Sequence, residues 1–128
     1  MFTNTKATNG FAVDDLDKAK EFYEGTLGLT TTVLSEEYGV MALHLAGGRD
    51  TLVYAKGDFK PATYTILNFE VDDVDTAVDG LSSSGVSFER YDDFDQDEKG
   101  IARGPGPAIA WFKDPAGNIF AVLEPGEM

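Results

Sequence analysis

The sequence contains an internal repeat, and this repeat limits the possible fold more than any other feature. Residues 11–19, FAVDDLDKA, align with residues 69–77, FEVDDVDTA, at an offset of 58, and six of the nine positions are identical. Unrelated segments of this length share roughly one identical position or none, so two copies of one structural unit explain the match better. We therefore expect one domain over residues 1–128, built from a first module of about residues 1–60 and a second of about 61–128.

Both copies of the repeat predict a strand that runs directly into a capped helix. The carboxylates of Asp14-Asp15 and Asp72-Asp73 can accept hydrogen bonds from the first turn of a helix and favour its positive end. Gly28 and Gly85 suit the left-handed residue that ends a helix. Apolar residues recur between these signals at helical spacing, at Leu16, Ala19, Phe22, Tyr23 and Leu27 in the first copy and at Val74, Ala77, Val78 and Leu81 in the second.

Alternating apolar and polar residues predict three strands after each helix. These strands cover residues 30–34, 40–45 and 51–55 in the first module and residues 86–91, 108–113 and 119–123 in the second. The turn DPAG at residues 114–117 joins the last two strands as a hairpin, and AGGRD at residues 46–50 has the same part in the first module. Each module is thus β-α-β-β-β, and two modules can wrap their helix-free sheet faces into a cup whose interior is the default binding site.

Composition excludes several classes of function. The 42% of hydrophobic residues supports a packed core, and no apolar run approaches the length of a membrane span. The net charge of −13 repels nucleic-acid backbones and anionic membranes. The sequence has no cysteine, which excludes disulfides, a thiol nucleophile and a thiolate metal site. The N-terminal residues lack the order of a signal peptide, so we expect a cytoplasmic protein without nucleic-acid or membrane partners.

Three segments together resemble the vicinal oxygen chelate superfamily, which contains glyoxalase I, bleomycin-resistance proteins, fosfomycin-resistance enzymes and extradiol dioxygenases. They are FAVDDLDKAKEFYEGTLGL, FEVDDVDTAVDGLSSSGV and WFKDPAGNIFAVLE. The resemblance implies an α+β fold in which two βαβββ modules form a cupped, eight-stranded mixed sheet with the helices outside. It also implies a homodimer.

The resemblance also implies where a metal ion is held in metal-dependent members. Their ligands lie five residues before the valine of the V-x-D pattern and three residues after the asparagine of DPxGN, which gives Thr8, Ile66 and Ala121. Aligning Ala42-Leu43 with Ala110-Trp111, at an offset of 68, adds Val53. Metals of this class need imidazole, carboxylate or thiolate donors. The sequence therefore predicts no metal site and no cofactor, and it argues against glyoxalase, fosfomycin-transferase and dioxygenase activity.

Without a metal site, the predicted interior of the cup is a mostly apolar lining, which suits a flat hydrophobic molecule. Tyr38, Tyr91 and Phe94 are expected near its rim, and side chains that simply fill the cup are the alternative. The segment Asp92–Pro107 is long enough for a mobile flap over the mouth, or for an ordinary surface loop. The predicted ligand-binding residues are Thr8, Ala12, Leu43, Leu45, Val53, Ile66, Asn68, Trp111, Lys113, Ile119 and Ala121.

His44 is the only histidine. If Leu43 pairs with Val53, then Leu43 and Leu45 line the cup and His44 points to the opposite face, where a structural role is expected. No nucleophile-elbow pattern supports a Ser-His-Asp triad.

The sequence therefore predicts a metal-free protein that binds a small apolar or aromatic molecule, as in drug sequestration or resistance. Two alternatives stay open: a metal-dependent lyase or dioxygenase with unrecognised ligands, and a metal-free enzyme that uses Glu70 or Lys113.

Overall fold

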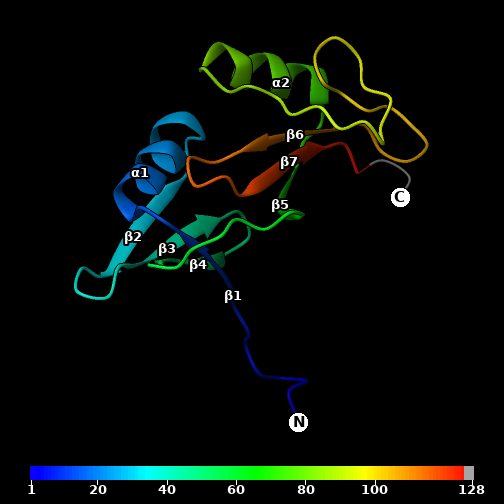
Figure 1. The fold of residues 1–128 in the computed structure, drawn as a ribbon. Coiled ribbons are helices and arrows are strands. Elements are labelled where there is room, and N and C mark those ends of the chain that lie inside the picture. The colour runs from blue at the N-terminus through cyan, green and yellow to red at the C-terminus, as the bar shows by residue number, and fades with distance from the viewer. Residues whose placement is uncertain (126–128) are drawn as a thin grey trace. The chain divides into compact units, whose positions relative to one another are not determined.

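The computed structural model describes residues 1–125 and divides into two compact units, Met1–Lys60 and the part from Pro61 onward. Each unit contains one β-sheet with a helix packed on one of its faces (Figure 1). The sheets are mixed, with four strands in the first unit and three in the second, which agrees with the predicted α+β fold. Within residues 1–125, no helix combines the length and the apolar character that a membrane span requires.

The first unit follows the predicted order of elements. They are β1 (Asn9–Val13), α1 (Leu16–Glu21), η1 (Phe22–Thr26), β2 (Thr30–Ser35), β3 (Val40–Leu45) and β4 (Arg49–Ala55). The strands are arranged β1-β4-β3-β2, with β1 parallel to β4 and the other neighbours antiparallel.

The helix of the first unit begins and ends where its sequence predicts. Asp15 accepts a hydrogen bond from the backbone N–H of Lys18 at 3.1 Å, and Gly28 has a φ of 71° just after the last turn. The second half differs from a regular α-helix, because η1 is a π-helix in which the N–H of Leu27 donates to the carbonyl of Phe22, five residues back.

Two contacts identify the sheet face that packs against this helix. The Tyr23 ring lies 6.3 Å from the Phe11 ring, edge to face, and the Glu24 carboxylate accepts a hydrogen bond from the Thr31 hydroxyl at 2.7 Å. Side chains alternate between faces, so the residues in register with Phe11 and Thr31 share the helix side. We call the opposite face of each sheet its far face.

The predicted register of the first hairpin is wrong. Leu43 pairs with Thr51 rather than with Val53. The turn closes within residues 46–48, because Gly47 and Gly48 adopt φ values of 82° and 69° that only glycine reaches easily. Two residues assigned to the turn therefore extend β4, which starts at Arg49.

The side on which the helix packs corrects the predicted lining. Leu43, Leu45 and Val53 lie on the helix side of the first sheet, with Leu43 and Val53 fully buried. They do not lie on the far face, where the sequence had placed them. The far face instead carries Ala12, Ala42, His44, Asp50, Leu52 and Tyr54.

The second unit repeats the design with one strand fewer. It consists of β5 (Thr65–Glu70), α2 (Val74–Ser83), β6 (Ile109–Lys113) and β7 (Ile119–Leu123), with the strand order β5-β7-β6. Asp73 caps α2, and Gly85 follows it with a φ of 94°. The helix packs on β6 and β7, over the ring contact of Phe112 with Phe120, whose centroids are 5.7 Å apart.

The strand predicted over residues 86–91 is absent from the described residues apart from one isolated bridge, between Phe88 and Phe112. A side chain replaces the neighbouring strand that these residues would need. The Gln96 amide accepts from the N–H of Tyr91 at 2.7 Å and donates to the carbonyl of Glu89 at 2.9 Å. The backbone is thereby satisfied without extending the sheet.

The two sheets correspond at a different offset from the one predicted. Gly10 pairs with Leu52 in the first sheet, and Asn68, the residue equivalent to Gly10, pairs with Ala121 in the second. The hairpin strands thus correspond at an offset of 69 instead of 68. The row Gly10, Leu52 and Ala42 of the first sheet matches the row Asn68, Ala121 and Trp111 of the second.

Replacement of the capping residue of α2 tests this assignment. Asp73→Ala removes the acceptor of the Thr76 N–H, at 3.2 Å, and we expect it to lower the free energy of unfolding by about 0.5–2 kcal/mol in urea titrations. Asp72→Ala is the matched control, because it removes the same charge beside the same helix from an exposed side chain. Equal losses in the two variants would show that charge, and not the cap, is responsible.

Candidate functional site

A cavity of about 420 Å³ opens on the far face of the second sheet. Two of its walls come from residues that the sequence had placed in the lining, Trp111 of β6 and Ile119 of β7. The others come from the start of β5 with the two residues before it, and from the loop after α2. The lining residues are Thr63, Tyr64, Thr65, Tyr91, Asp93, Phe94, Trp111 and Ile119.

Three aromatic rings form the centre of this cavity. The Trp111 ring lies 5.3 Å from Tyr91 at an interplanar angle of 80°, and 4.7 Å from Phe94 at 41°. Trp111 is buried among Ala102, Ile119 and Ala121, whereas half of the Phe94 surface is exposed. The result is a rigid ring at the base with a more accessible ring beside it, as stacking of a flat molecule requires.

The Tyr91 hydroxyl is the one buried side-chain polar atom without a hydrogen-bond partner among residues 1–125. Burial raises the pKa of this phenol, and the negative charge of Glu89 raises it further. The hydroxyl is therefore protonated at neutral pH, so it adds no charge to the cavity wall.

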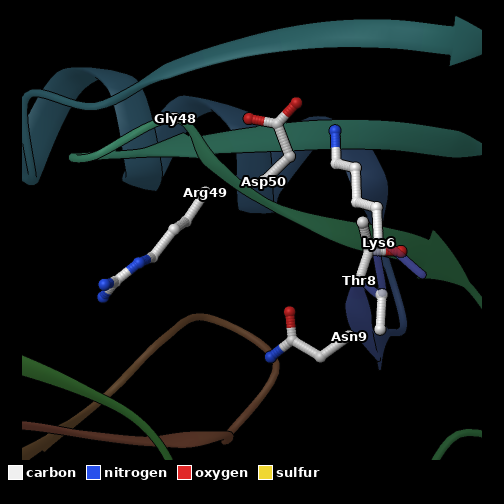
Figure 2. Close-up of a pocket in the computed structure, with 7 residues that line it drawn as sticks. Lys6, Thr8, Asn9, Gly48, Arg49 and Asp50 are labelled. Atoms are coloured by element: carbon white, nitrogen blue, oxygen red, sulfur yellow. The ribbon is translucent and has the colours of Figure 1, made fainter. Parts of the chain in front are cut away.

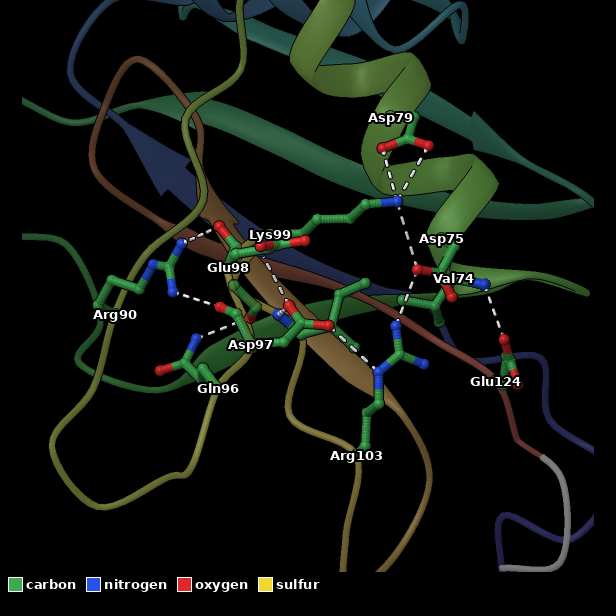
Figure 3. A network of polar contacts seen from close by, with 12 residues as sticks. Val74, Asp75, Asp79, Arg90, Gln96, Asp97, Glu98, Lys99, Arg103 and Glu124 are labelled. Atoms are coloured by element: carbon green, nitrogen blue, oxygen red, sulfur yellow. Dashed lines mark hydrogen bonds and ion pairs between the residues drawn. The ribbon is translucent and has the colours of Figure 1, made fainter.

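The loop that supplies Tyr91, Asp93 and Phe94 is folded around Asp97 (Figure 3). One oxygen of Asp97 accepts from the backbone N–H groups of Lys99 and Ile101, each at 2.9 Å. Burial opposes ionisation of Asp97, but these N–H groups and the Arg103 guanidinium outweigh it, so the pKa of the carboxyl lies below its ordinary value. The segment Asp92–Pro107, predicted as a flap or an ordinary loop, thus has a defined fold, and its function stays a prediction.

Ion pairs join the same loop to α2. Lys99 Nζ lies 3.1 Å from Asp79, and Arg103 donates to Asp75 at 2.8 Å (Figure 3). The hydrogen bond from Arg103 lowers the pKa of Asp75. Glu124, which follows β7, accepts from the N–H of Val74 at 2.8 Å and so holds the start of α2.

The first unit has a cavity of its own, of about 520 Å³ (Figure 2). It lies at the start of β1 and β4, and its lining includes no aromatic residue. Its lining residues are Lys6, Ala7, Thr8, Asn9, Gly48, Arg49 and Asp50. Of the predicted ligand-binding residues, only Thr8 belongs to this cavity.

A row of hydrogen-bonded side chains crosses the far face of the same sheet. His44 Nε2 lies 2.7 Å from Thr32 Oγ1, and His44 Nδ1 lies 2.9 Å from Asp50 Oδ1. The sequence analysis correctly places His44 and Leu43 on opposite faces of the sheet, but it assigns each of them to the wrong face. His44 lies on the far face, and Asp50 also lines the cavity.

The four implied metal positions do not suit a metal ion. At the offset of 69, Leu52 of the first sheet corresponds to Ala121 of the second. Leu52 therefore replaces Val53 as the fourth implied position, and it too is aliphatic. Ala121 is fully buried, Ile66 lies at a β-bulge, and only the Thr8 hydroxyl is a donor. No three His, Cys, Asp or Glu side chains within residues 1–125 gather into a metal-binding group.

Four further sequence-predicted residues lie outside the cavities. Ala12 and Asn68 are on the far faces of their sheets, and Glu70 is exposed at the end of β5. Lys113 is held 3.5 Å from Glu89. The sequence analysis missed the cavity residues Thr63, Tyr64, Thr65 and Asp93, although a tyrosine between two threonines at a strand start is a usable signal.

One family model matches most of the chain. The model of the Glyoxalase/Bleomycin resistance protein/Dioxygenase superfamily matches residues 7–122. No curated protein matches the chain.

Solved structures share the fold at low identity. One is TnmS3 from Streptomyces sp. CB03234, an antibiotic binding protein, which is 23% identical with a TM-score of 0.73 and with 97% of this chain and 99% of that chain covered. A superfamily member from Sphaerobacter thermophilus DSM 20745 is 25% identical, with a TM-score of 0.67 and coverage of 93% and 97%. Lactoylglutathione lyase from Agrobacterium tumefaciens is 21% identical, with a TM-score of 0.68 and coverage of 95% of each chain.

The fold of the Asp97 loop predicts a pH dependence. Because the pKa of Asp97 is lower in the folded chain than in the unfolded one, its carboxylate stabilises the fold above the ordinary aspartate value of about 3.9, and this contribution disappears as the pH falls through the folded value. We expect Asp97→Asn to lower the free energy of unfolding at pH 7 by about 1–3 kcal/mol, and we expect this deficit to shrink as the pH falls below about 3.9.

Asp95→Asn, in an exposed position of the same loop, is the control for the loss of one charge. Urea unfolding at a series of pH values measures both variants. An Asp97→Asn deficit that persists unchanged at pH 3 would contradict the assignment.

Proposed function

The chain belongs to the glyoxalase/bleomycin resistance protein/dioxygenase superfamily, and we propose that it is a metal-independent member that binds a small, mostly apolar or aromatic molecule and sequesters it. The observation that carries this proposal is the aromatic cavity around Trp111, with Tyr91 and Phe94 beside it.

The size and lining of the cavity support this class of ligand. Its volume of about 420 Å³ lies within the range of small-molecule sites. Phe94 and Tyr64 are 50% and 70% exposed, so a ligand that covers them removes apolar surface from water. Each aromatic stacking contact adds about 0.5–1.5 kcal/mol.

Charge narrows the class further. The chain carries a net charge of −13, and the only ionisable carboxylate in the cavity lining belongs to Asp93. A neutral or cationic aromatic molecule is favoured over an anionic one, because the protein field repels anions. TnmS3, which shares the fold, is an antibiotic binding protein, and this supports sequestration as the biological role.

The proposal of metal independence rests on the chemistry of the residues. Alanine, leucine and isoleucine at three of the four family positions supply no donor atom, and binding by stacking does not need one. A homodimer and a cytoplasmic location, both expected from the sequence, stay predictions that sedimentation and cell fractionation can test.

Trp111 is the only tryptophan, so its fluorescence reports directly on the cavity. Titration with a broad panel of neutral and cationic polycyclic aromatic compounds is expected to change this fluorescence saturably and to raise the Tm. Phe94→Ala should weaken binding about tenfold, through loss of one stacking contact and its buried area. Phe2→Ala is the control, since Phe2 is 74% exposed and belongs to the first unit. If no compound binds, the proposal fails.

Metal analysis tests the other half of the proposal. Purified protein is expected to hold far less than one equivalent of nickel, zinc, iron or manganese, and added metal should leave the affinity for the aromatic compound unchanged. A stoichiometric ion that resists dialysis would overturn metal independence and favour a lyase or dioxygenase with other ligands.

A further inference from the structure

The polar row of the first sheet contains the three groups of a nucleophile, a base and an orienting carboxylate. Thr32 of β2, His44 of β3 and Asp50 of β4 lie on neighbouring strands of one face, joined by contacts of 2.7 Å and 2.9 Å. Such a constellation is recognised by geometry and roles and does not depend on a sequence motif.

The position of the protons follows from the partners. An ionised Asp50 can only accept, so His44 Nδ1 carries the proton and donates to Asp50 Oδ1. In the neutral imidazole, Nε2 is then the acceptor, and the Thr32 hydroxyl must donate to it. The threonine oxygen is therefore polarised as it would be by a general base.

We propose that Thr32, His44 and Asp50 form an acyl-transfer site that hydrolyses small activated esters. Thr32 Oγ1 attacks the ester carbonyl while His44 Nε2 takes the hydroxyl proton, and the alcohol leaves with that proton. Water then attacks the acyl-threonine and gives up a proton to His44, which passes that proton to Thr32 Oγ1 as the acid is released. This assignment reverses the sequence-based expectation of a structural role for His44.

Exposure and sheet geometry define the substrates. Thr32 is exposed, and the side chains of His44 and Asp50 are 37% and 41% exposed, so an ester can reach the row. Strand N–H groups point along the sheet toward neighbouring strands, so this face offers no pair of backbone donors for an oxyanion. Only esters with good leaving groups, such as aryl esters, are therefore expected to react.

The cavity beside the row gives such an ester room. Asp50 belongs both to the row and to the cavity of about 520 Å³, where the cationic side chains of Lys6 and Arg49 lie (Figure 2). None of these residues lines the aromatic cavity, so the activity is independent of the proposed sequestration.

Hydrolysis of 4-nitrophenyl acetate tests the proposal. We expect Thr32→Ala and His44→Gln each to lower the rate about 100-fold, as loss of a nucleophile or a general base does, and Thr32→Ser to retain most of it. Asp50→Asn should lower it as well, because an amide can donate to Nδ1 and stabilise the wrong tautomer. Mass spectrometry of the quenched reaction should find an acetyl group on Thr32.

Thr30→Ala is the matched control, since Thr30 is an exposed residue of the same strand face and pairs with His44 in the sheet. Its rate should equal that of the unmodified protein, and thermal unfolding should show that every variant is folded. Diethyl pyrocarbonate, which modifies the single histidine, should abolish the activity. Equal rates for the unmodified protein and Thr32→Ala, or acetylation of lysines alone, would overturn the proposal.

Discussion

The pairing of the two hairpin strands in each unit is the constraint on which the other features depend. Leu43 opposite Thr51, and Trp111 opposite Ala121, decide which side chains meet the helix and which form the far face. Because the side-chain period of a strand is two, a slip of one residue would exchange the two faces completely. It would place Trp111 under α2 and expose the phenylalanines that now form the second core. Burial of those rings therefore fixes the register, and the register in turn places the residues of both candidate sites.

The second constraint is the folded loop between α2 and β6, which replaces a strand. A regular fourth strand would be held by a ladder of backbone hydrogen bonds, whereas this segment is held by side chains of Gln96 and Asp97. The arrangement lets the chain leave the sheet and bring Phe94 against Trp111. Its contacts with Asp75 and Asp79 of α2 are partly exposed ion pairs, which contribute little individually. The position of the loop thus depends mainly on hydrogen bonds inside it, since those bonds satisfy backbone groups that the sheet does not reach.

Much of this fold can be predicted from the sequence, because its strongest signals are local. The Asp15 and Asp73 caps, the glycine stops and five of the six strand patterns after the helices follow from residues close together in the chain. The failures are non-local. The apolar alternation of residues 86–91 meets β6 only at the Phe88–Phe112 bridge and through the hydrogen bond from the Glu89 N–H to the Trp111 carbonyl, and Gln96 satisfies the backbone beyond them. The offset of 68 rested on matching Ala42 with Ala110, whereas strand pairing gives an offset of 69. The polar row was missed because its three members meet only across strands.

The corrected register also explains how one duplicated unit can carry two kinds of surface. Trp111 occupies in the second sheet the position that Ala42 has in the first, and Ile119 occupies the position of Asp50. A ring that binds by stacking is best held among apolar groups, as Trp111 is by Ala102, Ile119 and Ala121, because polar neighbours lose hydration under the ligand. A proton-transfer row needs the reverse, with each polar atom hydrogen-bonded and reachable by water. One sheet face cannot meet both requirements. The duplicated unit provides two such faces, and the different residues at equivalent positions make one face aromatic and the other polar.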